Sequence, residues 1–218
     1  MHKVTTIGME GDVLAENRKL AQENLRNLRS HGLRSLDVMG SIGAGKTALI
    51  VRMAKELMSR GMKVATIAGD VTGEDDYTIF KNAGIASFNL NTGKECHLDA
   101  LLVEHVLEGI DLDSFDFLFV ENVGNLVCPA DFPLGTDHRM VVVSVTEGDD
   151  MINKHPMIFL DSDIAVLNKV DLVKVLDVDV ERLIRDYAKL RRNGTLYQTS
   201  AKTGDGILDV LTALNVKI

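Results

Sequence analysis

The chain has 218 residues, 45% of them hydrophobic, so it is long enough to bury one sizeable core. Its 24 basic and 32 acidic residues give a net charge of −8, which argues against nucleic acid or an anionic membrane surface as the main partner. No export signal is apparent, and no run approaches the ~18 apolar residues of a membrane span. We therefore expect a cytoplasmic protein that binds neither nucleic acid nor membrane.

An amphipathic helix is predicted first, over residues 12–31. Asp12 is a suitable N-cap, and Gly32 follows the expected end. The apolar residues that share one face are Leu14, Ala21, Leu25 and Leu28. We expect this helix to pack outside the core sheet, as an N-terminal helical arm (residues 1–33) in front of a globular domain (residues 34–218).

After the arm, predicted strands and helices alternate. The strands are expected at 35–39, 63–68, 85–90, 116–120, 140–145, 164–167 and 195–198. The helices are expected at 47–60, 75–83, 97–108, 178–191 and 206–214. Several of the strands are continuous apolar runs, which belong in a sheet covered on both faces. This order predicts a three-layer α/β fold with a doubly wound, mostly parallel sheet and a site at the carboxyl ends of the strands.

A phosphate-binding loop is predicted between the first strand and the next helix. Residues 40–47 read Gly-Ser-Ile-Gly-Ala-Gly-Lys-Thr and fit the pattern G-x-x-x-x-G-K-[ST]. In such a loop main-chain N–H groups and the helix N-terminus face the phosphates, while Lys46 adds positive charge and Thr47 a Mg²⁺ ligand. The residues expected to bind the nucleotide here are Gly40, Ser41, Gly43, Ala44, Gly45, Lys46, Thr47 and Ala48.

Carboxylates follow two other strands at the same edge of the predicted sheet. Glu121 comes directly after an apolar run and can hold Mg²⁺ directly or through water, and the Gly124 amide can approach a γ-phosphate. Asp70 follows another strand, and Asp76 lies early in the next helix. Oxygen ligands of this kind suit Mg²⁺. The predicted catalytic residues are Lys46, Thr47, Asp70, Asp76 and Glu121, and of these Thr47, Asp76 and Glu121 are the predicted Mg²⁺ ligands.

Guanine is the predicted base. Residues 168–171 read Asn-Lys-Val-Asp and resemble the N-K-x-D signature of GTPases. The Asp171 carboxylate would accept both N–H groups on one guanine edge, Asn168 would bond the opposite edge, and the Lys169 stem would lie over the ring. Adenine would leave Asp171 unpaired at a cost of roughly 1 to 3 kcal/mol or more, so GTP should bind better than ATP. A supporting loop is expected at Ser200, Ala201 and Lys202.

A second metal site is indicated by the only two cysteines, Cys96 and Cys128, and by His97. Thiolate and imidazole are ligands that Zn²⁺ and Ni²⁺ accept, and three ligands leave an open position, which suits a transferable ion. The alternative is that each cysteine is a small buried hydrophobic residue and that His97 caps a helix or lies on the surface. Cys128 follows Gly124 within at most ~14 Å of chain, so movement at a γ-phosphate could shift a metal ligand.

The expected helix at 97–108 affects how these ligands meet. Thr92 and Glu95 have capping-box spacing, which places Cys96 and His97 at the start of that helix. Adjacent helical residues diverge by about 100°, so the two side chains would not readily reach one ion within a single chain. A two-fold dimer that exchanges ligands between subunits would remove this difficulty.

Three segments carry a resemblance to a known family, at residues 91–100, 121–129 and 168–172. Over essentially residues 12–214 the chain resembles the HypB family, GTPases that assist nickel insertion into [NiFe]-hydrogenase. The resemblance implies GTP hydrolysis to GDP coupled to Ni²⁺ delivery, a GTP-promoted homodimer, and Zn²⁺ or Ni²⁺ at Cys96, His97 and Cys128. It also implies HypA, a zinc-containing accessory protein, as partner, the hydrogenase large-subunit precursor as an indirect one, and a fold in the nucleotide-dimerising branch of phosphate-loop GTPases.

Two departures qualify this resemblance. Regulatory GTPases usually carry D-x-x-G followed by Gln, whereas here residues 121–124 read Glu-Asn-Val-Gly and Asn125 follows, so intrinsic hydrolysis should be slow unless another group completes the site. The chain also lacks the Cys-rich and His-rich N-terminal segments of some family members. Two alternatives stay open: a urease-type nickel-insertion GTPase, whose metal motif is usually Cys-Pro-His, and a nucleotide-gated metal store with negligible turnover.

Overall fold

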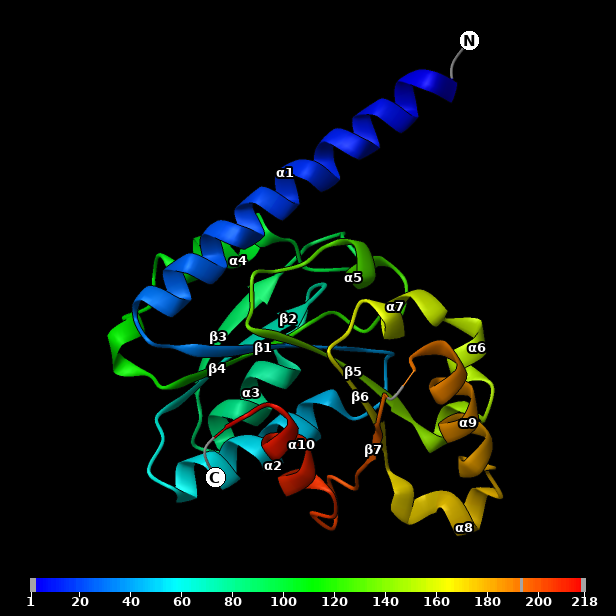
Figure 1. Cartoon of the computed structure of the whole chain (residues 1–218). Helices are drawn as coiled ribbons and strands as arrows, with labels where there is room; N and C mark the ends of the chain where they lie inside the picture. Colours follow the sequence, from blue (N-terminus) through cyan, green and yellow to red (C-terminus); the bar gives the residue numbers. More distant parts are fainter. Residues whose placement is uncertain (1–2, 193, 217–218) are drawn as a thin grey trace.

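The computed structural model describes residues 3–192 and 194–216, with side chains from residue 11 onward. This part of the chain forms a seven-stranded parallel sheet in the order β3-β2-β4-β1-β5-β6-β7 (Figure 1). The strands are β1 (Arg34–Gly40), β2 (Val64–Asp70), β3 (Ala86–Asn91), β4 (Phe117–Glu121), β5 (His138–Ser144), β6 (Ile164–Asn168) and β7 (Leu196–Gln198). The predicted doubly wound α/β fold and its strands are confirmed.

Helices cover both faces of this sheet (Figure 1). The longer ones are α1 (Lys3–Ser30), α2 (Lys46–Ser59), α3 (Asp75–Asn82), α4 (Ala100–Leu107), α9 (Val180–Leu190) and α10 (Ile207–Ala213). The short ones are α5 (Cys128–Asp131), α6 (Met151–Lys154), α7 (Pro156–Leu160) and α8 (Val173–Leu176), with 3₁₀ turns at Leu112–Ser114, Val145–Glu147 and Val170–Leu172. In the described part of the chain, no helix is both long enough and apolar enough to span a membrane.

Alternation along β4 places its side chains in two different hydrophobic clusters. Phe117 and Phe119 of β4 point to one face, in a cluster with residues of α2, α3 and α10. Leu118 and Val120 of the same strand point to the other face, in a cluster with residues of α1 and α4. Successive side chains of a strand point to opposite faces, so a strand covered on both sides reads as a continuous apolar run.

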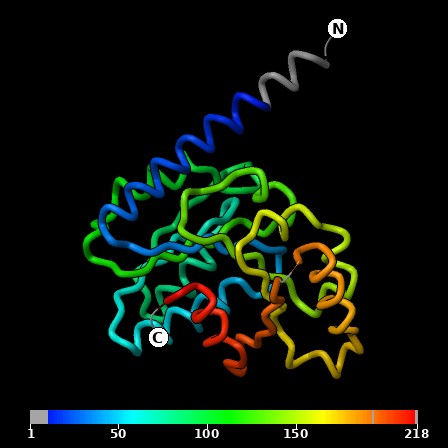
Figure 2. The backbone as a smooth tube through the Cα atoms, in the orientation of Figure 1, coloured from blue at the N-terminus to red at the C-terminus, as the bar shows by residue number. Residues whose placement is uncertain are grey.

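The N-terminal helix begins earlier than predicted, because α1 starts at Lys3 and Asp12 lies inside it rather than at its N-cap. Glycines and β-branched residues before Asp12 have weak helix propensity, which hid this part of the helix in the sequence. Ala21 and Leu28 are buried, whereas Leu14 and Leu25 are half-buried. The later part of α1 lies along α4 (Figure 2). The division of the chain at residue 33 stays a prediction.

Two buried asparagines, which the apolar pattern did not reveal, tie α1 to the rest of the molecule. Asn24 Nδ2 donates to the main-chain carbonyls of Ala100, at 2.8 Å, and Leu134, at 3.0 Å. Asn17 accepts from the Ala100 amide at 2.8 Å and donates to the Pro133 carbonyl at 3.0 Å. The helix is therefore fastened to the first residue of α4 and to the segment after α5.

Replacing Asn24 with alanine should lower the free energy of unfolding by about 1 to 3 kcal/mol, because two buried hydrogen bonds are lost. Asn27→Ala is the matched control, since Asn27 lies on the exposed side of the same helix. Urea denaturation followed by circular dichroism measures both variants. Equal stability of the two variants would show that the buried asparagine does not fasten α1.

Candidate nucleotide and metal sites

The predicted phosphate loop leaves β1 and enters α2 at Lys46. Gly45 has φ +91°, and a Cβ at this position would lie 2.6 Å from Asn168 Nδ2. A glycine is therefore required where the loop meets the carboxyl end of β6. Lys46 is buried, and its Nζ donates to the Ser41 carbonyl at 3.2 Å, so the ammonium group lies within the curl of the loop.

A cavity of about 400 Å³ lies in front of this loop. The predicted residues that line it are Gly43, Gly45, Lys46, Thr47, Asp70, Asp76, Glu121 and Gly124. Asp75 and Asn122 also line it, although neither was among the predicted site residues. Loops that follow β1, β2 and β4 supply these groups, because neighbouring parallel strands end at the same edge of the sheet.

Oxygen atoms gather at Thr47. Its Oγ1 lies 2.8 Å from Asp76 Oδ1 and 2.9 Å from Glu121 Oε1. Burial, together with the nearby Asp76 carboxylate, raises the pKa of Glu121 to about 8, and the Lys46 ammonium opposes this shift only in part. Within the described residues, the buried Glu121 Oε2 has no hydrogen-bond partner. A hard divalent cation fits this set, since it would satisfy the spare oxygen and offset the negative charge.

Asp70 ends β2 at the same cavity but is oriented differently. Its Oδ1 accepts from the amide of the next residue, Val71, at 2.6 Å. A Cβ on Gly73 would lie 2.1 Å from the other oxygen, so the loop after β2 folds closely around this carboxylate. The carboxylate thus shapes the loop beside the Thr47 cluster.

A second cavity, of about 310 Å³, lies beside the first one. The predicted base-binding residues that line it are Asn168, Lys169, Asp171, Ala201 and Lys202, and Gly45 and Ala48 line it from the phosphate loop and α2. Ser200 is not among the lining residues, but its Oγ donates to Oδ1 of the lining residue Asp171 at 2.6 Å. All the predicted base-binding residues therefore gather at one place.

Hydrogen bonds hold Asn168 and Lys169 between the base loop and the phosphate loop. Asn168 Nδ2 donates to the Ala44 carbonyl at 3.0 Å, and its Oδ1 accepts from the Ala201 amide at 3.2 Å. Lys169 Nζ donates to the Gly43 carbonyl at 2.6 Å. The two loops are thereby joined directly, as a shared nucleotide would require.

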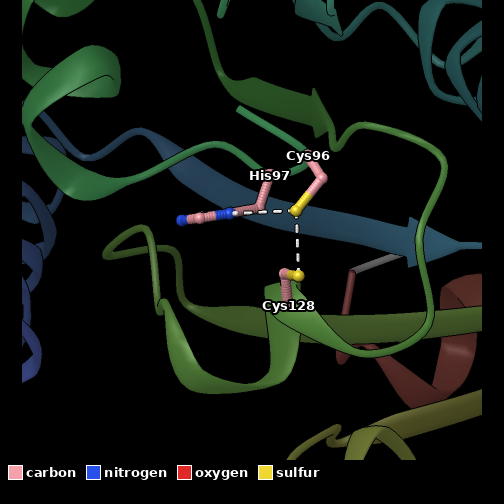
Figure 3. Close-up of side chains that lie close together, drawn as sticks. All are labelled: Cys96, His97 and Cys128. Carbon is pink, nitrogen blue, oxygen red and sulfur yellow. Dashed lines mark hydrogen bonds between the residues drawn. The ribbon is translucent and has the colours of Figure 1, made fainter. Parts of the chain in front are cut away.

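The ligand atoms of Cys96, His97 and Cys128 all lie within 4.8 Å of one another. The Cys96 thiol donates to Cys128 Sγ over 2.9 Å and lies 3.8 Å from His97 Nδ1 (Figure 3). The His97 ring packs on Phe132, with ring centroids 4.0 Å apart. Burial lowers the pKa of His97 and so favours the neutral imidazole that binds metals, whereas the neighbouring Cys96 thiol raises the pKa of Cys128.

The predicted helical position of Cys96 and His97 is wrong. Helix α4 begins only at Ala100, with the Asp99 side chain accepting from the Leu102 amide as N-cap. Thr92 Oγ1 donates to the Glu95 carbonyl at 2.6 Å, so the expected capping box does not form. Because the two ligands lie on a loop, the divergence expected of adjacent helical residues does not apply. One chain brings the three predicted ligands together without a second copy.

Asn125 links the phosphate loop to this triad of Cys96, His97 and Cys128. Its main-chain amide donates to the Gly40 carbonyl at 3.0 Å, and its Nδ2 donates to the Cys96 carbonyl at 3.3 Å. Gly124 packs so closely that a Cβ there would lie 2.4 Å from Ile42 Cγ1. Asn125 was noted in the sequence only as a replacement for the usual glutamine. The segment after β4 thus contacts the phosphate loop on one side and the loop of Cys96 and His97 on the other.

The fold and these two cavities define a phosphate-loop nucleotide-binding protein with an adjoining cluster of two thiols and an imidazole. The family model described as "CobW/HypB/UreG, nucleotide-binding domain" matches residues 35–198. The chain therefore belongs to the CobW/HypB/UreG family, and the relatives described next place it among the HypB proteins.

The chain is 45% identical over 211 residues to the probable hydrogenase maturation factor HypB of Methanocaldococcus jannaschii, covering 97% of this chain and 95% of that one. The crystal structure of HypB from Archaeoglobus fulgidus is 41% identical, with a TM-score of 0.84 over 92% of this chain and 98% of that chain. HypB from Helicobacter pylori in complex with nickel is 31% identical, with a TM-score of 0.86 over 92% of this chain and 94% of that chain.

Proposed function

We propose that this protein is a GTP-hydrolysing nickel metallochaperone that assists nickel insertion into [NiFe]-hydrogenase. The observation that carries the proposal is the short physical connection between its two sites. Residues 121–128 run from the Thr47 cluster to Cys128, and within them Asn125 bonds to both the phosphate loop and the Cys96 loop. The relatives named as hydrogenase maturation factors, and the HypB structure that contains nickel, support the choice of pathway and metal.

GTP is the proposed nucleotide. The Asp171 carboxylate lines the second cavity, where it would accept the paired N–H groups of guanine, and Asn168 and Lys169 are already oriented by the phosphate loop. Lys46 would bind phosphate oxygens in place of the Ser41 carbonyl that it now contacts. These contacts favour a nucleotide that spans both cavities.

Hydrolysis would depend on Thr47, Asp76 and Glu121, which would hold Mg²⁺. The ion, when bound, would offset the charge on the phosphate oxygens. Asn125 follows Gly124, as the water-positioning Gln follows D-x-x-G, but its side chain is occupied with the Cys96 carbonyl and the Val127 amide. This geometry supports slow intrinsic hydrolysis that a partner or a second subunit accelerates.

Ni²⁺ would be the cargo at Cys96, His97 and Cys128, and Zn²⁺ a competing ion. Three ligands leave one position open, through which an acceptor could take the ion. Cys96 is exposed and the other two are half-buried, so the cluster is accessible from outside. We propose a GTP-dependent homodimer, a HypA-type accessory protein as direct partner and the hydrogenase large-subunit precursor as indirect partner.

A nucleotide-gated metal store is the second candidate, favoured by the engaged side chain of Asn125. A urease-type role has less support, because Ala130 rather than histidine follows Cys128 and Pro129. Phosphate release at saturating GTP or ATP, with Mg²⁺ and with or without Ni²⁺, distinguishes these functions. The proposed GTPase should turn over GTP in preference to ATP and bind nickel. Negligible turnover with retained nickel binding would identify a store, and absence of both would overturn the proposal.

A further inference from the structure

A buried carboxylate is linked through two neighbouring side chains to both chain segments that carry the proposed metal ligands. Asp37, in the middle of β1, is fully buried. An isolated charge inside a protein is costly, so it needs close polar partners. Asp37 has two: Asn122 Nδ2 donates to its Oδ1 at 3.1 Å, and Arg139 Nε lies 3.5 Å from its Oδ2.

Asn122 connects this carboxylate to the chain segment that carries Cys96 and His97. Its Oδ1 accepts from the Leu98 amide at 3.1 Å, and Leu98 directly follows His97 in the chain. Leu98 is itself fully buried. The same Oδ1 also accepts from the Val123 amide at 3.0 Å, while Nδ2 faces the Asp37 carboxylate, so Asp37 and Val123 together orient the amide that holds the main chain after His97.

Arg139 connects the same carboxylate to the chain segment that carries Cys128. Its guanidinium donates to the main-chain carbonyls of Pro129 and of Ala130, the latter at 3.3 Å. These two residues follow Cys128 within the short helix α5. The Pro129 carbonyl also accepts from the Phe132 amide at 3.3 Å, so Arg139 adds a second donor there and a side-chain donor to the Ala130 carbonyl at the end of this one-turn helix.

We propose that Asp37 is a positioning residue for the metal site. It orients Asn122 toward the segment that carries Cys96 and His97, and Arg139 toward the segment that carries Cys128. In this way it sets the spacing of the two thiols and the imidazole, although it touches none of them. This inference rests on the proposed metal function of the triad. Groups that hydrogen-bond directly to metal ligands affect metal affinity by about 10- to 100-fold when they are changed, and Asp37, which lies one contact further out, should have an effect at the lower end of that range.

The test variant is Asp37→Asn, which keeps the size of the side chain but removes its charge. The first measurement needs no metal: it is the rate at which diamide oxidises Cys96 and Cys128 to a disulfide. In this reaction each thiol gives up one proton and one electron, and diamide is reduced to the hydrazine. We expect oxidation about 10-fold slower than in the unaltered protein, because the thiols are no longer held together. The Co²⁺ affinity should fall by about 10-fold, with a changed thiolate-to-cobalt absorption band.

Asp186→Asn is the matched control, because Asp186 is also a buried carboxylate but lies on α9, bonded to Asn153 and Lys189. It should leave the oxidation rate and the Co²⁺ spectrum unchanged. Equal effects of both variants, or no effect of Asp37→Asn, would overturn the positioning role. If Asp37→Asn does not fold, Arg139→Lys is the second test variant. It keeps the positive charge but loses the guanidinium that donates to both the Pro129 and Ala130 carbonyls. An unchanged oxidation rate and Co²⁺ spectrum in this variant would overturn the proposal.

The same experiment separates this inference from the proposed function. If the unaltered protein binds neither Co²⁺ nor Ni²⁺, the metal function fails, whereas the disulfide rate still reports whether Asp37 sets the geometry of the thiols. If metal binds normally but Asp37→Asn behaves as the Asp186→Asn control, only the positioning role fails.

Discussion

Replacing Cys128 with alanine should abolish binding of Ni²⁺ and Zn²⁺ while leaving the affinity for GTP nearly intact. The variant loses one of three ligand atoms that lie within 4.8 Å of one another. Because Cys128 does not line the nucleotide cavities, the change removes no expected nucleotide contact. Equilibrium dialysis with elemental analysis measures the metal, and a fluorescent GTP analogue measures nucleotide affinity in the absence of Ni²⁺ and Zn²⁺.

Val127→Ala is the control for the Cys128 variant, since Val127 is the preceding residue and its side chain is 61% exposed. It should bind metal and nucleotide as the unaltered protein does. A loss of both ligands in Cys128→Ala, to the same degree, would contradict the existence of two separate sites. Retained stoichiometric nickel would show that the ion binds elsewhere.

Asp171→Asn should move base preference from guanine to xanthine. An asparagine amide offers a donor where the carboxylate offered an acceptor, and xanthine carries a carbonyl where guanine carries the exocyclic amino group. The loss of paired bonds is worth roughly 1 to 3 kcal/mol, so GTP affinity should fall by about 5- to 150-fold. Competition among GTP, XTP and ATP for the bound fluorescent analogue measures the change.

Asp177→Asn serves as the control for the base assignment. Asp177 is exposed and lies just past α8, with φ 51°, a conformation that asparagine tolerates well. Its variant should keep the original preference for GTP. Unchanged GTP selectivity in Asp171→Asn would refute the assignment of guanine to the second cavity.

The strands were predictable because their apolar runs reflect burial on both faces, as Leu118 and Phe119 of β4 illustrate. The short helices α5 to α8 were not, because four or five residues are too few to show a helical period. The start of α4 was mistaken for a local reason: the Thr92 hydroxyl bonds to a carbonyl instead of capping, and Asp99 provides the N-cap.

Most residues that line the two cavities could be predicted from short motifs, in which chain neighbours act together. The network around Asp37 could not, since Asn122 lies 85 residues away and Arg139 lies 102 residues away along the chain. The one signal in the sequence was a charged residue within an otherwise apolar strand run. A buried charge of this kind requires partners, but the sequence alone does not say which ones.

We propose that nucleotide state alters the positions of Cys96, His97 and Cys128 through residues 121–128. The most direct measurement is the dissociation constant for Ni²⁺ in the presence of GDP and of a non-hydrolysable GTP analogue. We predict that the two values differ by about 5- to 150-fold, and that nickel changes the affinity for the analogue by the same factor. Equal nickel affinity in both nucleotide states, with each nucleotide shown to be bound, would contradict this coupling between the nucleotide and the metal site.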